Sequence, residues 1–176
     1  IDDCKKADMD QVINMIVGRT LDEKFPHRES HIGEVALEVD DFQIPNTIYD
    51  ISFKVHKGEV LGFSGLVGSG RTSTAKAIIG AIPRTCGTIK IDGKPVKINN
   101  PSDAIACGIG YLPEDRKYEG LLLTKTVKEN ISLPSLRRKF SRGIVINSRK
   151  ERDSAEEYKE KLRIKTPSIN RMTKFL

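Results

Sequence analysis

The chain has 176 residues, with 30 basic and 24 acidic side chains and a formal net charge of +6. That length allows one domain, with room for an appendage. Hydrophobic residues make up 38% of the chain, which is enough to bury a core and excludes a wholly disordered protein. The basic excess suits phosphate, nucleic acid or a lipid surface as a partner, but a mild excess is also typical of a solvated face, so charge does not choose among them.

The cysteines are Cys4, Cys86 and Cys107, an odd number without CxxC spacing. This pattern argues against a zinc site or a disulfide framework and favours a reducing compartment. No apolar run approaches the roughly 20 residues that a membrane helix needs. We therefore expect a soluble or peripheral protein.

Residues 1–33 differ from the rest of the chain. Asp8 can cap a helix that Gly18 would end, and residues 25–33 have the polar composition of a linker. An isolated helix of this length is marginal, so we expect it to belong to a preceding unit. Its apolar stripe, at helical spacing, consists of Met9, Val12, Ile13 and Ile16.

Five apolar patterns predict strands after residue 33. Alternation over residues 35–39 and again over 51–55 is typical of half-buried strands. The nearly continuous apolar run 60–64 predicts a strand buried on both faces, and residues 109–112 predict another that ends at Pro113. Alternation over residues 88–98 around Asp92-Gly93 predicts a hairpin.

Helical patterns lie between and after these strands. Residues 71–79 form one, which Gly80 would stop, and Asn100-Pro101 opens another that Gly108 would close. Residues 126–133 and 148–162 are helical as well, with a basic loop around residues 137–139 between them. This order predicts an α/β core with an antiparallel β layer and the beginning of a helical subdomain.

The segment Gly65-Leu66-Val67-Gly68-Ser69-Gly70-Arg71-Thr72 matches the phosphate-loop pattern G-x-x-x-x-G-K-[ST], except that arginine replaces lysine. Glycines let backbone N–H groups face a phosphate, and the positive end of the following helix dipole lies behind them. Thr72 would place its hydroxyl on Mg²⁺, and Arg71 would supply a cation at the β- and γ-phosphates. Because a guanidinium is bulkier than an ammonium, nucleotide binding can survive the replacement while full catalytic geometry is not ensured.

Two other interpretations compete at this loop. A glycine-rich turn could connect strand and helix without binding anything, although the predicted strand–loop–helix context favours a phosphate site. A dinucleotide fold requires G-x-G-x-x-G and an acidic residue about 20 residues further on, whereas here the glycines run G-x-x-G-x-G and that acidic residue is missing.

Hydrolysis needs an acidic residue at the end of a second buried strand and a group that polarises water. The sequence has no run of four apolar residues ending in Asp or Glu, and no N-K-x-D motif of a GTPase. The nearest candidate is Glu114, which follows the apolar run 109–112. We interpret Asp115 and Arg116 as a charged turn, and for Glu114 both a functional and a structural role stay open.

Taken together, these features resemble the second nucleotide-binding half of a sugar-importer ABC ATPase of the ribose, galactose and xylose type, in which two ATPase halves are fused in one chain. The resemblance extends over almost all of residues 34–176, and residues 1–33 resemble the tail of a first half running into a linker. The motifs that carry it, besides the phosphate loop, are Ile51-Ser52-Phe53, Gly58-Glu59, Pro83-Arg84-Thr85, Pro113-Glu114-Asp115-Arg116-Lys117 with Gly120-Leu121, Val127-Lys128-Glu129-Asn130-Ile131, and, before the linker, Met15 to Arg19 and Phe25-Pro26.

The resemblance implies a P-loop NTPase fold in three parts: a tail and linker (1–33), a phosphate-loop core with an antiparallel β layer (34–116), and the start of a helical subdomain (117–176) that stops before the family's signature motif. It implies ATP and Mg²⁺ as cofactors, with Thr72 and Glu114 at the metal and Glu114 at the Q-loop position. The implied nucleotide-binding residues are Gly65, Leu66, Val67, Gly68, Ser69, Gly70, Arg71, Thr72 and Ser73.

The resemblance also implies partners. ATP would be sandwiched between this half and the signature motif of another ATPase half, in the same chain or in a second copy. Closure of the two halves on ATP would drive permease subunits at the cytoplasmic face of the membrane. No nucleic acid is expected as a partner. Arg71 and Glu114 replace the usual Lys and Gln, which implies an impaired or regulatory site. No aromatic residue for adenine is obvious, since Phe42 fits a core strand.

Because the signature and a second acidic strand would follow Leu176, we do not expect this chain alone to turn over ATP. Two other functions remain as alternatives. The net charge and the basic stretch 137–165 suit an ABC-type ATPase that acts on nucleic acid or ribosomes. The second alternative is an interaction module whose glycine loop is purely structural.

Overall fold

The computed structural model describes residues 8–17 and 30–176. Helix α1, Met9–Val17, forms where the sequence predicts a helix, and the N–H of Val12 donates to the carbonyl of Asp8 at 3.0 Å. The expected helix end at Gly18 and most of the expected linker lie outside the described residues. The division of the chain at residues 33 and 116 stays a prediction.

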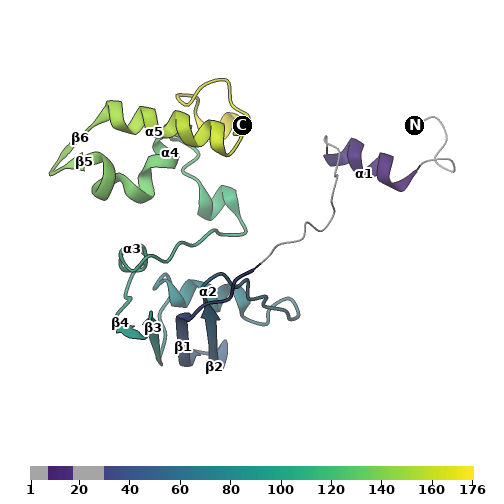
Figure 1. The fold of residues 1–176 in the computed structure, drawn as a ribbon, viewed down its shortest axis with the longest axis vertical. Helices are drawn as coiled ribbons and strands as arrows, with labels where there is room; N and C mark the ends of the chain where they lie inside the picture. The colour runs from purple at the N-terminus through teal and green to yellow at the C-terminus, as the bar shows by residue number, and fades with distance from the viewer. Residues whose placement is uncertain (1–7, 18–29) are drawn as a thin grey trace.

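Four strands form one antiparallel sheet in the order β2-β1-β3-β4 (Figure 1). The alternating segments of the sequence become β1, Val35–Ile44, and β2, Ile48–His56, which pair with each other. The hairpin expected around Asp92-Gly93 becomes β3, Cys86–Ile91, and β4, Lys94–Val96. The antiparallel β layer predicted from period-two patterns is therefore confirmed.

One face of this sheet packs on two helices to form the core. Helix α2, Arg71–Ile78, is followed by Gly80, and α3, Pro101–Ala106, begins at its predicted cap, Asn100, whose side chain accepts the N–H of Asp103 at 3.1 Å. Phe42 is fully buried, as expected of a core strand residue. The buried apolar side chains of this core are Val39, Phe42, Ile44, Ile48, Ala77, Ile78, Ile79, Ile89, Ile98 and Ala104.

Two predicted strands do not form. Residues 60–64 and 109–112 have no regular structure, and Val60 and Leu112 are 78% and 92% exposed. The prediction of a strand buried on both faces was therefore wrong for this chain. A strand requires a hydrogen-bonded neighbour, and no segment within residues 30–176 pairs with either run.

The rest of the chain forms a helical lobe. Helix α4, Val127–Ser132, and helix α5, Ser148–Lys161, match the predicted helices within about a residue and lie side by side (Figure 1). They are held by the hydroxyl of Ser132, which donates to the buried carboxylate of Glu151 at 2.6 Å. Short turns flank these helices: the π-turn η2, Arg116–Gly120, precedes α4, the 3₁₀ turn η3, Leu133–Ser135, directly follows α4, and the 3₁₀ turn η5, Thr173–Phe175, follows α5.

The basic loop expected around residues 137–139 is helical instead. It forms the π-turn η4, Leu136–Phe140, which buries Phe140 and leads into a short hairpin of β5, Ser141–Arg142, and β6, Val145–Ile146. The helical turn buries one aromatic side chain, Phe140. The run of charged residues before it gives no sign of this burial in the sequence. Among residues 8–17 and 30–176, no helix combines the length and the apolar character needed to cross a membrane.

Candidate functional site

The glycine-rich segment 65–70 leads directly into α2. The N–H of Ser69 donates to the carbonyl of Leu66 at 3.1 Å, which turns the loop back on itself. Gly70 has φ of 86°, in the left-handed region that favours glycine, and a Cβ there would lie 2.8 Å from Cδ1 of Ile48. Both the conformation and the space at this position therefore require glycine.

Helix α2 begins without a side-chain cap. The cap position is Gly70, which has no side chain to offer, whereas Asn100, Thr126 and Asn147 cap α3, α4 and α5 with hydrogen bonds. The first N–H groups of a helix need an acceptor from outside the helix. Those of Arg71, Thr72 and Ser73 find none within residues 30–176. These three N–H groups, together with the helix dipole, form an arrangement that suits a phosphate.

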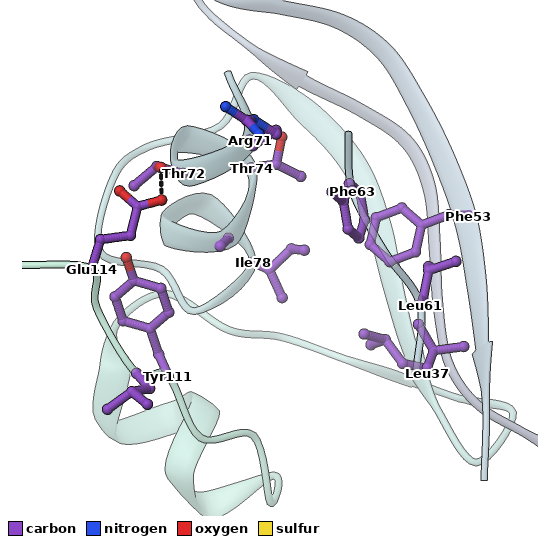
Figure 2. Close-up of a pocket in the computed structure, with 13 residues that line it drawn as sticks. Leu37, Phe53, Leu61, Phe63, Arg71, Thr72, Thr74, Ile78, Tyr111 and Glu114 are labelled. Carbon is purple, nitrogen blue, oxygen red and sulfur yellow. Dashed lines mark hydrogen bonds between the residues drawn. The ribbon is translucent and has the colours of Figure 1, made fainter. Parts of the chain in front are cut away.

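Two oxygen-bearing side chains meet beside these N–H groups. The hydroxyl of Thr72 donates to Oε1 of Glu114 at 3.0 Å, across 42 residues of sequence (Figure 2). Hydroxyl and carboxylate oxygens are ligands that Mg²⁺ accepts, and Mg²⁺ usually keeps several waters with only one or two protein ligands. The donor set therefore fits Mg²⁺, even though residues 8–17 and 30–176 hold no cluster of three or more His, Cys, Asp or Glu for a metal.

Glu114 is held near α2 by an ion pair that the sequence did not predict. Nζ of Lys76, on α2, lies 2.6 Å from Oε1 of Glu119, in the π-turn η2 that follows Glu114. The hydrogen bond that Lys76 donates to the Glu119 carboxylate raises the pKa of Lys76, against the opposing effect of burial. The side chain of Asp115 caps the same turn by accepting the N–H groups of Lys117 and Tyr118, which confirms the charged turn predicted there. No sequence spacing indicates the contact between Lys76 and Glu119, because it joins two elements that are adjacent only in the fold.

A cavity of about 500 Å³ opens beside this cluster. One wall is polar and carries Arg71, Thr72 and Glu114; the opposite wall is apolar, with Phe53 and Phe63 in edge-to-face contact at 5.0 Å between ring centroids (Figure 2). The cavity has room for a phosphorylated ligand on its polar side. The fully buried Phe42 does not line it, so Phe42 offers no face to an adenine ring.

The predicted site residues thus come together in one place. Residues 65–73 form one continuous loop and helix start, with Leu66 and Val67 exposed at its tip, and Glu114 joins them through Thr72. Arg71 is exposed at the mouth of the cavity, where its guanidinium can meet a ligand.

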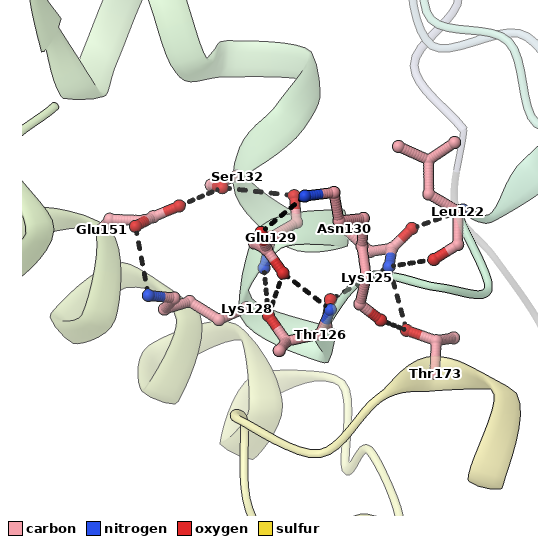
Figure 3. Close-up of polar contacts among 9 residues, drawn as sticks. All are labelled: Leu122, Lys125, Thr126, Lys128, Glu129, Asn130, Ser132, Glu151 and Thr173. Carbon is pink, nitrogen blue, oxygen red and sulfur yellow. Dashed lines mark hydrogen bonds and ion pairs between the residues drawn. The ribbon is translucent and has the colours of Figure 1, made fainter.

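A second polar cluster lies in the helical lobe (Figure 3). Thr126 and Glu129 cap α4 reciprocally, and the side-chain amide of Asn130 donates to the carbonyl of Leu122 at 3.0 Å and to Oγ1 of Thr173 at 2.9 Å. Hydrogen bonds from the backbone and side chain of Thr126, with a smaller contribution from Lys125, lower the pKa of Glu129 to about 2. The polar groups of this cluster find their partners inside the protein, so it is structural.

The comparisons with known proteins point to one family. The ABC transporter family matches residues 48–175. The chain is 44% identical over 169 residues to a "Putative ribose/galactose/methyl galactoside import ATP-binding protein 3" of Burkholderia ambifaria, covering 96% of this chain and 33% of that protein. It is 43% identical over 172 residues to the "Ribose import ATP-binding protein RbsA" of Clostridium tetani, covering 98% of this chain and 34% of that protein.

A third relative is similar to the same extent. "Ribose import ATP-binding protein RbsA 3" of Rubrobacter xylanophilus is 42% identical over 172 residues, again covering 98% of this chain and 34% of the relative. The chain therefore spans about a third of the length of the curated relatives it matches. These matches confirm the resemblance drawn from the sequence and give no support to the nucleic-acid alternative. The mixed α/β chain, with its glycine loop opening an uncapped helix, belongs to the ABC transporter family of ATPase domains.

Proposed function

We propose that this chain is part of the ATP-binding subunit of a carbohydrate importer and that residues 65–73 bind the phosphates of ATP. The names of the relatives support the transport role, since each is a sugar import ATP-binding protein. The observation that carries the nucleotide site is the uncapped start of α2, where three N–H groups without acceptors within residues 30–176 lie beside Arg71, Thr72 and Glu114.

Each residue has a distinct task in this proposal. The N–H groups of Arg71, Thr72 and Ser73 donate to phosphate oxygens, and the Arg71 guanidinium adds charge-assisted hydrogen bonds. Thr72 and Glu114 would hold Mg²⁺, which neutralises charge on the β- and γ-phosphates when it is bound. The Lys76–Glu119 ion pair keeps the loop that carries Glu114 against α2.

The substitutions at two positions suggest that the site binds better than it hydrolyses. Arginine at position 71 presents a planar fork where the family pattern has a lysine ammonium. Glu114 is a carboxylate at the position of the Q-loop glutamine. We therefore propose that the site holds ATP with little or no turnover in this chain, as in a regulatory site.

The partners and location follow from the same proposal. In the whole protein, the ATPase halves would close on ATP and move permease subunits at the cytoplasmic face of the membrane. The relatives, about three times as long as this chain, leave room for a second ATPase half in one polypeptide.

Titration with a fluorescent ATP analogue and Mg²⁺ tests the proposal. Replacing Arg71 by Ala removes a cation that makes charge-assisted hydrogen bonds, so we expect the affinity to fall about tenfold or more. Arg171→Ala is the control, because Arg171 is an exposed arginine outside the cavity. An unchanged affinity in Arg71→Ala, or an equal loss in both variants, would contradict the phosphate site and favour a structural glycine loop.

A further inference from the structure

The basic charge of this protein is concentrated in one surface segment. Residues 137–152, which we call the basic hairpin, carry seven basic side chains and one acidic one, an excess equal to the +6 of the whole chain. The seven basic side chains, all exposed, are Arg137, Arg138, Lys139, Arg142, Arg149, Lys150 and Arg152.

The acidic exception does not offset this charge at the surface. Glu151 is buried, and its carboxylate accepts the Ser132 hydroxyl at 2.6 Å and pairs with Lys128 at 3.4 Å. Asp153, just beyond the segment, lies 3.6 Å from Arg152 and 4.0 Å from Arg149. Within residues 8–17 and 30–176, the remaining cations of the basic hairpin make no ion pair. The outward face of the segment is therefore almost purely positive.

The tip of the basic hairpin is apolar. Strands β5 and β6 are joined through Gly143, whose φ of 61° suits a tight hairpin turn, and Ile144. Ile144 is 99% exposed and Val145 68% exposed, and Ile146 beside them is exposed as well. A single exposed aliphatic side chain is ordinary, but three in a row on a projecting turn form a contiguous patch that suits a contact.

The basic hairpin is anchored at the end of the helical lobe. Phe140 is buried at its base, and the N–H of Asn147 donates to the carbonyl of Phe140 at 2.7 Å. The side chain of Asn147 then caps α5 by accepting the N–H of Lys150. Figure 1 shows β5 and β6 projecting at one end of α5, apart from the phosphate loop. A partner could therefore bind there without covering the nucleotide site.

Cations around an aliphatic tip match the chemistry of an anionic lipid surface. Lys and Arg near such a surface are attracted to its phosphates, and aliphatic side chains enter the boundary between headgroups and acyl chains. Single-stranded nucleic acid would instead need exposed aromatic side chains for stacking, and the only aromatic residue of the segment, Phe140, is buried. We propose that the basic hairpin binds anionic phospholipid bilayers, with its cations at the headgroup phosphates and Ile144 and Val145 in the interface.

Flotation of the protein with vesicles tests this inference, which does not depend on the nucleotide site. We expect binding to vesicles of phosphatidylglycerol mixed with phosphatidylcholine, weakening as salt rises, and no binding to phosphatidylcholine alone. The double variant Lys139→Gln/Arg142→Gln should partition about tenfold less, since each cation near the surface contributes several-fold. Ile144→Ser should bind about threefold less, because it withdraws apolar area from the interface.

A matched double variant separates this site from general charge attraction. Lys94→Gln/Lys97→Gln also removes two exposed cations, from the β3–β4 hairpin and the residues after it, and should bind like the parent protein. Equal losses in the two double variants would overturn the proposal. So would unchanged binding of Ile144→Ser combined with full competition by RNA, which would point to a nucleic-acid surface. Equal thermal unfolding midpoints of all variants would show that the substitutions leave folding unaffected.

Discussion

Helices α2 and α4 begin in opposite ways. At α4, the Thr126 side chain accepts the N–H of Glu129, and the Glu129 side chain accepts the N–H of Thr126 in return. At α2, the cap is Gly70, and no side chain of residues 30–176 accepts one of the first N–H groups. Every helix leaves its first N–H groups without intrahelical acceptors, so the same physical requirement is met by a side chain at α4 and by no side chain of the described residues at α2.

In our proposal, this difference separates a structural helix start from a ligand-binding one. Helices α3 and α5 begin in the same way as α4, because the side chains of Asn100 and Asn147 cap them. Only α2, among these four, combines an uncapped start with a glycine loop and a convergent hydroxyl and carboxylate, those of Thr72 and Glu114. The missing cap is therefore a positive sign of a ligand, because a phosphate can supply the missing acceptors.

The largest expected effect comes from changing the uncapped start itself. In Gly70→Ala, the new Cβ would lie 2.8 Å from Ile48 in a left-handed conformation, so the loop must shift away from the shape that we propose binds phosphate. We expect the affinity for a fluorescent ATP analogue to fall more than about tenfold, since the N–H groups lose their common direction.

The control for that variant is Gly93→Ala, which introduces the same kind of backbone strain at a position outside the proposed site. Gly93 has φ of 74° in the β3–β4 turn, and a Cβ there would meet nothing within 4 Å. Gly93→Ala should lower the stability by about 1 kcal/mol through backbone strain and leave ATP affinity unchanged. If the two variants lost affinity equally, the role assigned to Gly70 would be wrong.

The next effect is on stability and concerns the capped start. Thr126→Ala removes the hydroxyl that accepts the Glu129 N–H, so we expect the free energy of unfolding to fall by about 1 kcal/mol. Urea denaturation measures the change, and Thr126→Ser should restore most of it. ATP affinity should not respond. If Thr126→Ala lost ATP affinity at unchanged stability, the assignment of a structural role to the start of α4 and a binding role to the start of α2 would be wrong.

A smaller effect depends on pH. The pKa of Glu129 is about 2, lowered from its ordinary value of 4.5. A carboxylate whose pKa is lowered in the folded state contributes stability above its ordinary pKa and loses it as the pH falls through the folded value. Wild type should therefore be more stable than Glu129→Gln above about pH 5, by less than about 1 kcal/mol because the group is partly exposed. The gap should close between pH 4.5 and about 2, and a gap that stayed constant would refute this role.

Local patterns in the sequence predicted most of the elements correctly. The alternation over residues 35–39 and 51–55 became β1 and β2, and the cap at Asn100 was placed at the right residue. Such features depend on neighbours within a few positions, so the sequence alone contains the information. The glycine loop before α2 belongs to the same class.

Features that depend on distant partners were missed or mistaken. The apolar runs 60–64 and 109–112 have the composition of buried strands, but composition does not show whether a neighbouring strand is present to pair with them. The contact between Lys76 and Glu119 joins positions 43 residues apart. The proximity of Thr72 and Glu114 has the same origin, and it could be expected only through the resemblance to a family.

In the proposed site, the N–H groups of Arg71, Thr72 and Ser73 complete their hydrogen bonds with ATP phosphates. Amide NMR resonances of a labelled protein, followed during titration with ATP and Mg²⁺, test it directly. We expect the largest shifts on these three amides, much smaller shifts with AMP, and unchanged resonances for the first amides of α4. Shifts confined to other residues, or equal shifts with AMP, would contradict it.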